Sequence, residues 1–329
     1  MRRHLLCMLL LVLQPLAART AEIADATGRS VQIPDRPVRI LPAGPPAAVL
    51  LGALAPDLMV GWPYSLSPEA RAWLPEVINA LPKVPMLTGR QNVIAEVASL
   101  HPDLILDYGS VSPRYIQLDD DARTKTGIPT VLLDGALSKT PRIFRELGVA
   151  LHREERASVL ALEAEAILAG ISPSHGNPLR VVYGFGPDGL DIAAADAGAA
   201  EVFNLINWQV LAREGTGAIR RTSIDVIASL NPDVLVFQSP GMRQVVAQSA
   251  QWRALRAVRE HHAYVMPARP FGWLGEPPSI NRLLGVAALS SGGSGTAVLA
   301  ATFYAVVYGR SRTNEQMNAL RESLQPLSP

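Results

Sequence analysis

The chain has 329 residues, 48% hydrophobic and 18% charged, which is enough apolar side chain for two packed cores and excludes an intrinsically disordered protein. Its formal charge of +1 argues against a nucleic-acid-binding protein, which normally carries a basic domain or stripe. The 27 prolines disfavour a coiled coil or a helical bundle, because they favour short elements separated by turns.

The N-terminus has the pattern of a secretory signal. Met1–His4 is positively charged, Leu5–Leu16 is a short apolar run, and alanines at 17, 18 and 21 suit cleavage. About a dozen apolar residues are too few for a membrane span, which needs about 20. We therefore expect residues 1–21 to be a signal peptide and the mature protein to be soluble in the periplasm.

Cys7, the only cysteine, lies within this segment. A mature chain would therefore contain no disulfide, no thiolate metal site and no cysteine nucleophile. Removal of Arg2, Arg3 and Arg19 with the segment would change the formal charge from +1 to −2.

An internal repeat indicates the architecture. Ile94–Leu106 and Ile224–Val236 both run from a helical turn through Ser-Leu-x-Pro-Asp into an aliphatic run. Pro102 and Pro232 cannot continue a helix, and the aspartate after each suits a turn. The apolar runs that follow are suited to buried parallel strands. The sequence therefore contains a helix, turn and strand unit twice.

Further strand candidates flank both copies of this unit, and their alternation with helices predicts an α/β fold of two mostly parallel-sheet lobes. These candidates are Val38–Leu41, Leu58–Gly61, Thr130–Leu133, Leu179–Tyr183 and Ala263–Met266.

A long helix is predicted between the lobes. Residues 153–169 contain no Gly or Pro and are rich in Ala, Leu and Glu, which favours one continuous helix. We divide the chain into an N-terminal lobe (36–140), a linker with the interlobe helix (141–172) and a C-terminal lobe (178–320). A rigid helix leaves little room for a wide hinge motion. Strand ends of the two lobes would face a ligand cleft between them.

Several segments together resemble a known family. They are Arg39–Leu41, Leu50–Leu54 and Leu58–Gly61; Gly89 before Leu100–Leu106; Leu147-Gly148 with Arg153–Ala157; Pro277–Gly285; and Phe303-Tyr304 with Val307–Gly309. Over about residues 36–320 the chain resembles the helix-linked (class III) periplasmic solute-binding proteins that serve ABC importers of iron-siderophore, haem or corrinoid compounds. The resemblance implies a monomeric, non-enzymatic receptor without a cofactor. Such a receptor captures an iron or other metal chelate and delivers it to an inner-membrane permease with a cytoplasmic ATPase.

The same resemblance implies a permease-docking carboxylate on each lobe, just before the Pro-Asp strand. Asp225 occupies that place in the second lobe. In the first lobe the position is Ala95, and Glu96 is one residue further along. Because one residue turns a helical side chain by about 100°, Glu96 serves this role only if the register differs.

Candidate ligand-binding residues follow the predicted strands. Flat aromatic faces suit a planar or catecholate chelate, and an arginine suits its negative charge. The same rings could instead pack the lobe edges, and the arginine could form a surface ion pair. The candidates are Trp62, Tyr64, Tyr108, Tyr183, Arg269, Phe271 and Trp273.

The sequence also leaves other ligands, and an enzymatic activity, as alternatives to chelate binding. Direct binding of a bare metal ion is disfavoured, because the histidines are scattered apart from the adjacent His261 and His262. A small oxyanion such as molybdate, held by arginine and backbone amides, is an alternative, as is a haem or corrinoid. A periplasmic enzyme that modifies a small chelate is the competing class, but no nucleophile and base occur at a recognisable spacing.

Three further segments have ordinary structural interpretations. Gly184–Gly189 spells the dinucleotide fingerprint, but its Pro-Asp-Gly predicts a turn between two strands rather than the start of a helix. Asp119–Asp121 lacks the spacing of a calcium loop and is expected to be solvated in a loop or at a helix N-terminus. Ser290–Gly295 is expected to be a surface loop, since no Lys-Ser or Lys-Thr follows it.

Overall fold

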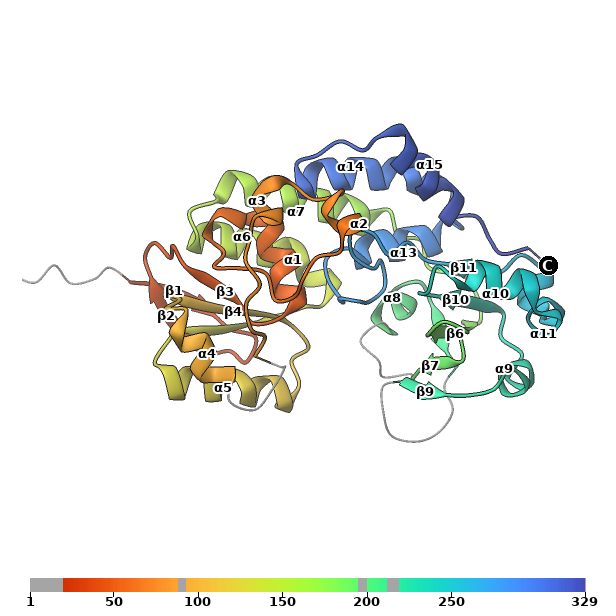
Figure 1. Cartoon of the computed structure of the whole chain (residues 1–329), viewed down its shortest axis with the longest axis horizontal. Helices are drawn as coiled ribbons and strands as arrows, with labels where there is room; N and C mark the ends of the chain where they lie inside the picture. Colours follow the sequence, from red (N-terminus) through yellow and green to blue (C-terminus); the bar gives the residue numbers. More distant parts are fainter. Residues whose placement is uncertain (1–19, 88–92, 195–199, 212–218, 329) are drawn as a thin grey trace, which may run out of the picture.

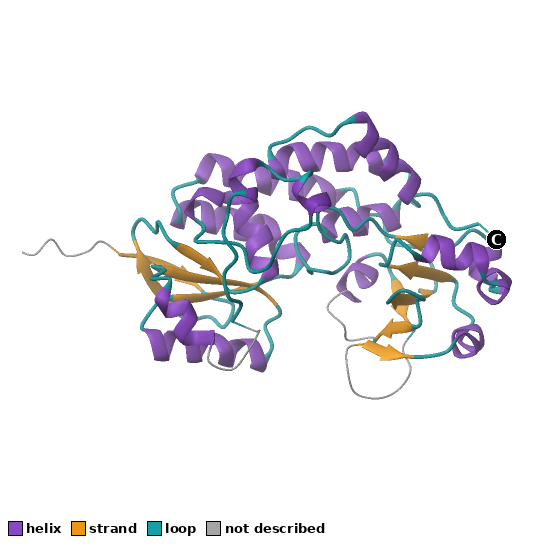
Figure 2. Cartoon of the chain, viewed as in Figure 1, coloured by secondary structure: helices purple, strands orange, loops and turns teal. Residues whose placement is uncertain are grey.

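The computed structural model describes residues 20–87, 93–194, 200–211 and 219–328. The expected signal segment up to residue 19 and Gly89 lie outside this part, whereas Thr20 and Ala21 begin the first strand. Sheets form two lobes at opposite ends of the molecule, and helices extend between them (Figure 2). This arrangement confirms the predicted α/β fold with mostly parallel sheets.

The N-terminal lobe is built on a parallel sheet with the strand order β3-β4-β5. Its buried strands are aliphatic, as expected for a parallel sheet covered on both faces. A β1-β2 hairpin extends this lobe at the end of the molecule (Figure 1). The elements are β1 (Thr20–Ala24), β2 (Ser30–Pro34), β3 (Ile40–Pro42), α1 (Pro45–Leu54), η1 (Pro56–Leu58), α2 (Pro68–Arg71), α3 (Glu76–Asn79), α4 (Val93–Ser99), β4 (Leu104–Gly109), α5 (Pro113–Thr126), β5 (Thr130–Asp134) and η2 (Leu137–Lys139).

The C-terminal lobe contains a mixed sheet with the order β11-β10-β6-β7-β9, and β8 also pairs with β6. Strands β6, β8, β10 and β11 are parallel, whereas β7 and β9 are antiparallel additions. The elements are β6 (Leu179–Phe185), β7 (Asp191–Ala193), α8 (Ala200–Leu205), β8 (Trp208–Val210), β9 (Ile219–Arg221), α9 (Ile224–Leu230), β10 (Val234–Phe237), α10 (Met242–Gln248), α11 (Ala250–Ala254), α12 (Arg256–Arg259) and β11 (Ala263–Val265).

The internal repeat is reproduced in its hydrogen bonds. In the first copy, Asp103 accepts from the backbone N–H of Arg39, whose guanidinium donates to the two carbonyls before Pro102. In the second copy, Asp233 accepts from the N–H of Arg180, whose guanidinium donates to the corresponding carbonyls. In each copy, an aspartate and an arginine fasten the helix-to-strand turn to the neighbouring strand.

Helices connect the lobes across one side of the molecule (Figure 1). The predicted interlobe helix is α7 (Glu154–Ala169), which packs against α6 (Thr140–Ala150), α13 (Arg282–Ser290) and α14 (Thr296–Tyr308). A Cβ on Gly148 would lie 2.3 Å from Cβ of Ala157, so glycine is needed for the close contact between α6 and α7. One hydrophobic cluster contains residues of both sheets and of these helices.

Three local predictions were incomplete or wrong. Leu58–Gly61 forms no regular strand: it begins in η1 and pairs with Ile40 only at Met59. Asp119–Asp121 lies inside α5 rather than in a loop or at a helix N-terminus, and Asp119 is buried. Ser290 is the last residue of α13, so the turn at the predicted loop consists of residues 291–295.

The turn prediction for Gly184–Gly189 is confirmed: Gly184 and Phe185 end β6, and Gly186–Gly189 turns into the antiparallel strand β7. The segment around Phe303, which carried part of the resemblance, is helix α14, followed by α15 (Asn314–Ser323). In the part of the chain that the structure describes, no helix is both long and apolar enough to cross a membrane.

Candidate ligand cavity between the lobes

An open cavity of about 240 Å³ lies between the lobes, at the carboxyl ends of β4 and β5. This is the edge of an open α/β sheet at which ligands bind. The N-terminal lobe provides one wall, and the opposite wall comes from α8 and from the segment that leads into α13. Its lining residues are Gly109, Ser110, Val111, Asp134, Gly135, Ala136, Glu201, Pro278 and Arg282.

A glycine contact fixes the N-terminal wall. Gly135 follows β5, and its N–H donates to the carbonyl of Gly109 at the end of β4, over 2.7 Å. A Cβ on Gly135 would lie only 2.6 Å from Cα of Gly109. Only glycine therefore allows the two strand ends to approach this closely, and the contact leaves the Gly135 carbonyl facing the C-terminal lobe.

Charged groups at the cavity are paired. Asp134 forms an ion pair with Lys139 and accepts from the N–H of Ala136. Arg282, whose side chain is buried, forms an ion pair of 2.9 Å with Glu201. Buried charges are tolerated when they are paired and hydrogen-bonded. The cavity therefore combines small side chains and backbone groups with compensated charges.

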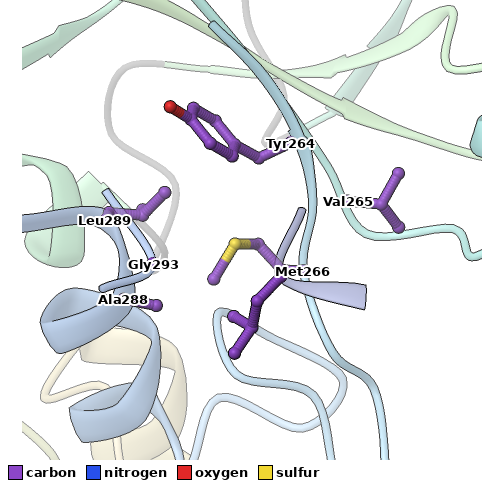
Figure 3. A pocket seen from close by; sticks show the side chains of 7 residues that line it. Tyr264, Val265, Met266, Ala288, Leu289 and Gly293 are labelled. Carbon is purple, nitrogen blue, oxygen red and sulfur yellow. The ribbon is translucent and has the colours of Figure 1, made fainter. Parts of the chain in front are cut away.

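Two other hollows fit a solute less well. One lies between the end of β11 and α13, where Tyr264, Met266, Ala288 and Leu289 surround it (Figure 3). Its volume of about 10 Å³ has room for one water molecule at most. The other, of about 270 Å³, is lined by helices α7, α13 and α14 and the 291–295 turn, and no strand end reaches it.

The aromatic candidates are mostly buried against protein. Trp62, Tyr108, Tyr183, Phe271 and Trp273 are each 2% exposed or less. They present almost no surface to a solute in this structure, although their binding role remains a prediction. Tyr64 is half-buried, and Arg269 is exposed outside the described cavity lining.

Several of these rings form an aromatic bridge between the lobes. Trp62 stacks on Phe271 with ring centroids 5.6 Å apart, and Trp73 meets Tyr304 edge to face at 5.4 Å. Phe271 and Tyr304 both contact Tyr308 of α14. We use the name aromatic bridge for Trp62, Trp73, Phe271, Trp273, Tyr304 and Tyr308.

The polar atoms of three buried rings are hydrogen-bonded within the protein, whereas the buried indole N–H of Trp62 has no hydrogen-bond partner in the described structure. The indole N–H of Trp273 donates to the Tyr304 hydroxyl, which donates to the carbonyl of Arg269. The Tyr183 hydroxyl donates to Gln238. Burial raises the pKa of Tyr183 well above its usual value and that of Tyr64 to about 12. These hydroxyls are therefore neutral, and a phenolate ligand for a bare metal ion is disfavoured.

The two docking candidates lie on equivalent helices of the repeat. Asp225 is exposed in the first turn of α9, whose N-terminus is capped by Ser223. Glu96 is exposed on α4, and Ala95 beside it is exposed as well. Within the described ranges, no three His, Cys, Asp or Glu side chains gather so that they could hold a metal ion.

Comparison with known proteins identifies the family of this chain. The family model for periplasmic binding proteins matches residues 50–270. The chain belongs to the periplasmic binding protein family. No curated protein matches its sequence.

Solved periplasmic binding proteins share its fold at low sequence identity. An ABC transporter solute-binding protein from Sulfurospirillum deleyianum has a TM-score of 0.81 and 21% identity, covering 91% of this chain and 98% of that one. The molybdate-bound MolA of Haemophilus influenzae has a TM-score of 0.64 and 16% identity over 89% and 99% of the chains. Helicobacter pylori CeuE with Ni(II) bound has a TM-score of 0.63 and 13% identity over 91% and 99%.

Sequence reasoning missed the polar residues of this periplasmic binding protein's cavity. Arg282 belongs to the Pro277–Gly285 segment that carried the resemblance, but nothing in that segment indicates its partner. Glu201 lies 81 positions away, and no local pattern joins the two. The available signal was the Tyr108-Gly109-Ser110 sequence at the end of β4, but the prediction from that sequence selected the buried Tyr108 ring instead of the exposed Ser110.

Proposed function

We propose that this protein captures a metal chelate of the siderophore type in the interlobe cavity and delivers it to an inner-membrane ABC permease with a cytoplasmic ATPase. In this proposal the mature protein works as a soluble periplasmic monomer and catalyses no reaction. The cavity carries the proposal, because it lies at the carboxyl ends of the strands and both lobes line it.

The side chains near the cleft favour a chelated metal over a bare metal ion. The described residues supply no cluster of metal ligands, and the buried tyrosines are held neutral. A whole chelate brings its own ligand atoms and needs only shape, apolar contact and hydrogen bonds from the protein. The backbone groups and Ser110 at the end of β4 can provide those hydrogen bonds.

The cavity volume makes an oxyanion the second candidate. About 240 Å³ is below the roughly 300–1,000 Å³ of pockets that enclose a drug-sized ligand, so a chelate would insert one part and leave the rest in the open cleft. A tetrahedral oxyanion would fit entirely. Arg282 is already bound to protein acceptors, which disfavours the oxyanion.

Isothermal titration with a ferric catecholate, a ferric hydroxamate, haem, a corrinoid and molybdate tests the proposal. We expect saturable one-to-one binding of a ferric chelate. Ser110→Trp, which fills the cavity from an exposed position, should weaken it at least about tenfold. Ser172→Trp, in the exposed segment after α7, is the matched control and should bind normally. Binding of molybdate alone, or of nothing in the panel, would overturn the chelate proposal.

Delivery to the permease is tested separately from ligand capture. Asp225→Arg should abolish uptake and leave the dissociation constant unchanged, because Asp225 is exposed on α9 and absent from the described cavity lining. Glu96→Arg tests the first lobe in the same way. Unchanged uptake in either variant would remove that residue from the docking surface.

A further inference from the structure

An ion pair in the cavity wall is hydrogen-bonded to the backbone of the N-terminal lobe. Arg282 at the start of α13 donates from Nη1 to Oε2 of Glu201 over 2.9 Å. Glu201 lies on α8 of the C-terminal lobe, and Arg282 begins α13, which packs against α8. Each also holds the backbone of the N-terminal lobe: Arg282 Nη2 donates to the Gly135 carbonyl over 2.6 Å, and the Leu137 N–H donates to Glu201 Oε1 over 2.6 Å.

We propose that Glu201 and Arg282 form an interlobe latch, which grips the chain after β5 and fixes the width of the cavity. On one side of the latch Arg282 donates and Glu201 accepts; on the other, the Leu137 N–H donates and the Gly135 carbonyl accepts. Both hydrogen bonds form together in only one relative position of the lobes. A contact that served only to join α8 to α13 would need the Glu201–Arg282 pair alone. The additional hydrogen bonds to Gly135 and Leu137 show that the pair also holds the two lobes together.

The local structure supports each half of the latch. The Gly135 carbonyl is held in place because its residue packs against Gly109 with no room for a Cβ. Arg282 is aligned by a third bond, from Nε to the carbonyl of Ser279 over 3.3 Å. Charge-assisted hydrogen bonds are the strong class, and a pre-aligned guanidinium loses little freedom in forming them.

The latch is also placed so that it can open. The Glu201 side chain is 29% exposed, whereas that of Arg282 is only 5% exposed. Water in the cleft can therefore replace the protein partners of Glu201 when the lobes separate, and Arg282 keeps its bond to Ser279. In the proposed receptor, the latch would favour the closed form around a solute. That functional meaning depends on the proposed function, whereas the geometric claim does not.

The test measures the distance between the lobes without any ligand. Cys7, the only native cysteine, is changed to Ser, and spin labels are attached at Ala95→Cys on α4 and Ala228→Cys on α9. Both alanines are exposed, and they lie on the equivalent helices of the two lobes. Pulsed electron-electron double resonance then reports the distribution of interlobe distances.

In the parent we expect one dominant distance. Glu201→Ala should add a population at longer distance and raise the ratio of open to closed forms about tenfold or more, because it removes two hydrogen bonds to a charged group. Glu201→Gln keeps the shape and should give a smaller shift in the same direction, and it covers the case in which the alanine variant folds poorly. Glu165→Ala is the matched control: it removes the exposed Arg145–Glu165 pair between α6 and α7 and should leave the distribution unchanged.

Unchanged distributions in both Glu201 variants would overturn the latch. An equal shift in Glu165→Ala would also overturn it, because loss of any surface ion pair would then produce the effect. Since no ligand is added, a failure here leaves the titration result intact. A failed titration likewise leaves the distance measurement valid.

Discussion

The two lobes are joined in two physically different ways. The aromatic bridge joins them through stacked and edge-to-face rings that are almost fully buried. The latch joins them at the cavity through a partly exposed carboxylate, a guanidinium and two backbone groups. Both connect the same lobes, yet separation of the rings exposes apolar surface, whereas separation of the latch exchanges protein hydrogen bonds for water.

This difference assigns the two contacts different roles. Exposed apolar surface has no compensating interaction in water, and each large buried ring contributes several kcal/mol. A hydrogen bond exchanged for water has a net value of only about 1 kcal/mol, or up to about 3 kcal/mol with a charged group. The aromatic bridge is therefore the permanent joint, and the latch is the contact that changes during opening.

The largest expected effect comes from cutting the aromatic bridge. Phe271→Ala removes the ring that stacks on Trp62 and meets Tyr308. Since this ring is 2% exposed, we expect the free energy of unfolding to fall by about 3–5 kcal/mol. Urea denaturation followed by circular dichroism measures it. Phe271→Leu, which keeps apolar volume, should lose less than half as much. If Phe271→Ala lowers the free energy of unfolding by less than about 1 kcal/mol, the Trp62–Phe271 stack contributes little to the stability of the interlobe contact.

The Glu201 carboxylate of the latch has two hydrogen-bond partners, and a buried carboxylate on α5 provides the contrast to it. Asp119 on α5 is 2% exposed, and neither of its oxygens has a hydrogen-bond partner in the structure as described. Burial, with the nearby charge of Asp107 as the next cause, raises the pKa of Asp119 to about 8. In the unfolded chain its pKa is near 3.8. The folded protein therefore holds a proton here at neutral pH that the unfolded chain releases.

This proton makes stability depend on pH. The contribution is fully present below about pH 4 and is lost as the pH rises to about 8. Asp119→Asn needs no proton, so it should raise the free energy of unfolding at pH 8 by roughly 2–4 kcal/mol and have little effect at pH 4. Asp121→Asn, on the exposed side of the same helix, is the control and should give no gain at pH 8. Equal effects of Asp119→Asn at both pH values would contradict the assignment.

The sequence predicted the scaffold better than the site, for physical reasons. The Ser-Leu-x-Pro-Asp repeat is local, since proline ends the helix and the aspartate and aliphatic run follow within a few residues. Its two copies therefore predicted α4-β4 and α9-β10. The absence of Gly and Pro likewise predicted α7, because helix propensity sums over neighbouring residues.

The cavity depends on contacts that are distant in the sequence. Aromatic residues after strands were expected either to face a solute or to pack the lobe edges, and the sequence could not show that Trp62 packs against Phe271, more than 200 positions away. Glu201 and Arg282 meet the chain after β5 only when the lobes are assembled. Asp119 was expected to be solvated, and the packing of α5 on the sheet buries it instead. Charge and ring type predicted the kinds of contact, whereas only the assembled fold determined their partners.

The smallest expected effect loosens the aromatic bridge without cutting it. The guanidinium of Arg312 lies 5.4 Å from the Trp73 ring centre and 5.5 Å from that of Tyr304, and it donates to the Trp73 carbonyl over 2.8 Å. Arg312→Lys keeps the charge and loses the planar stacking surface, so we expect a loss of about 1 kcal/mol in unfolding free energy. Arg310→Lys is the control, because Arg310 reaches the Leu74 carbonyl without a cation–π contact recorded in the described chain. Equal losses would assign the effect to the backbone hydrogen bonds. If only Arg312→Lys lowers the unfolding free energy and the interlobe distances stay unchanged, the aromatic bridge can be weakened without separating the lobes. Weakening the latch, by contrast, is expected to change those distances.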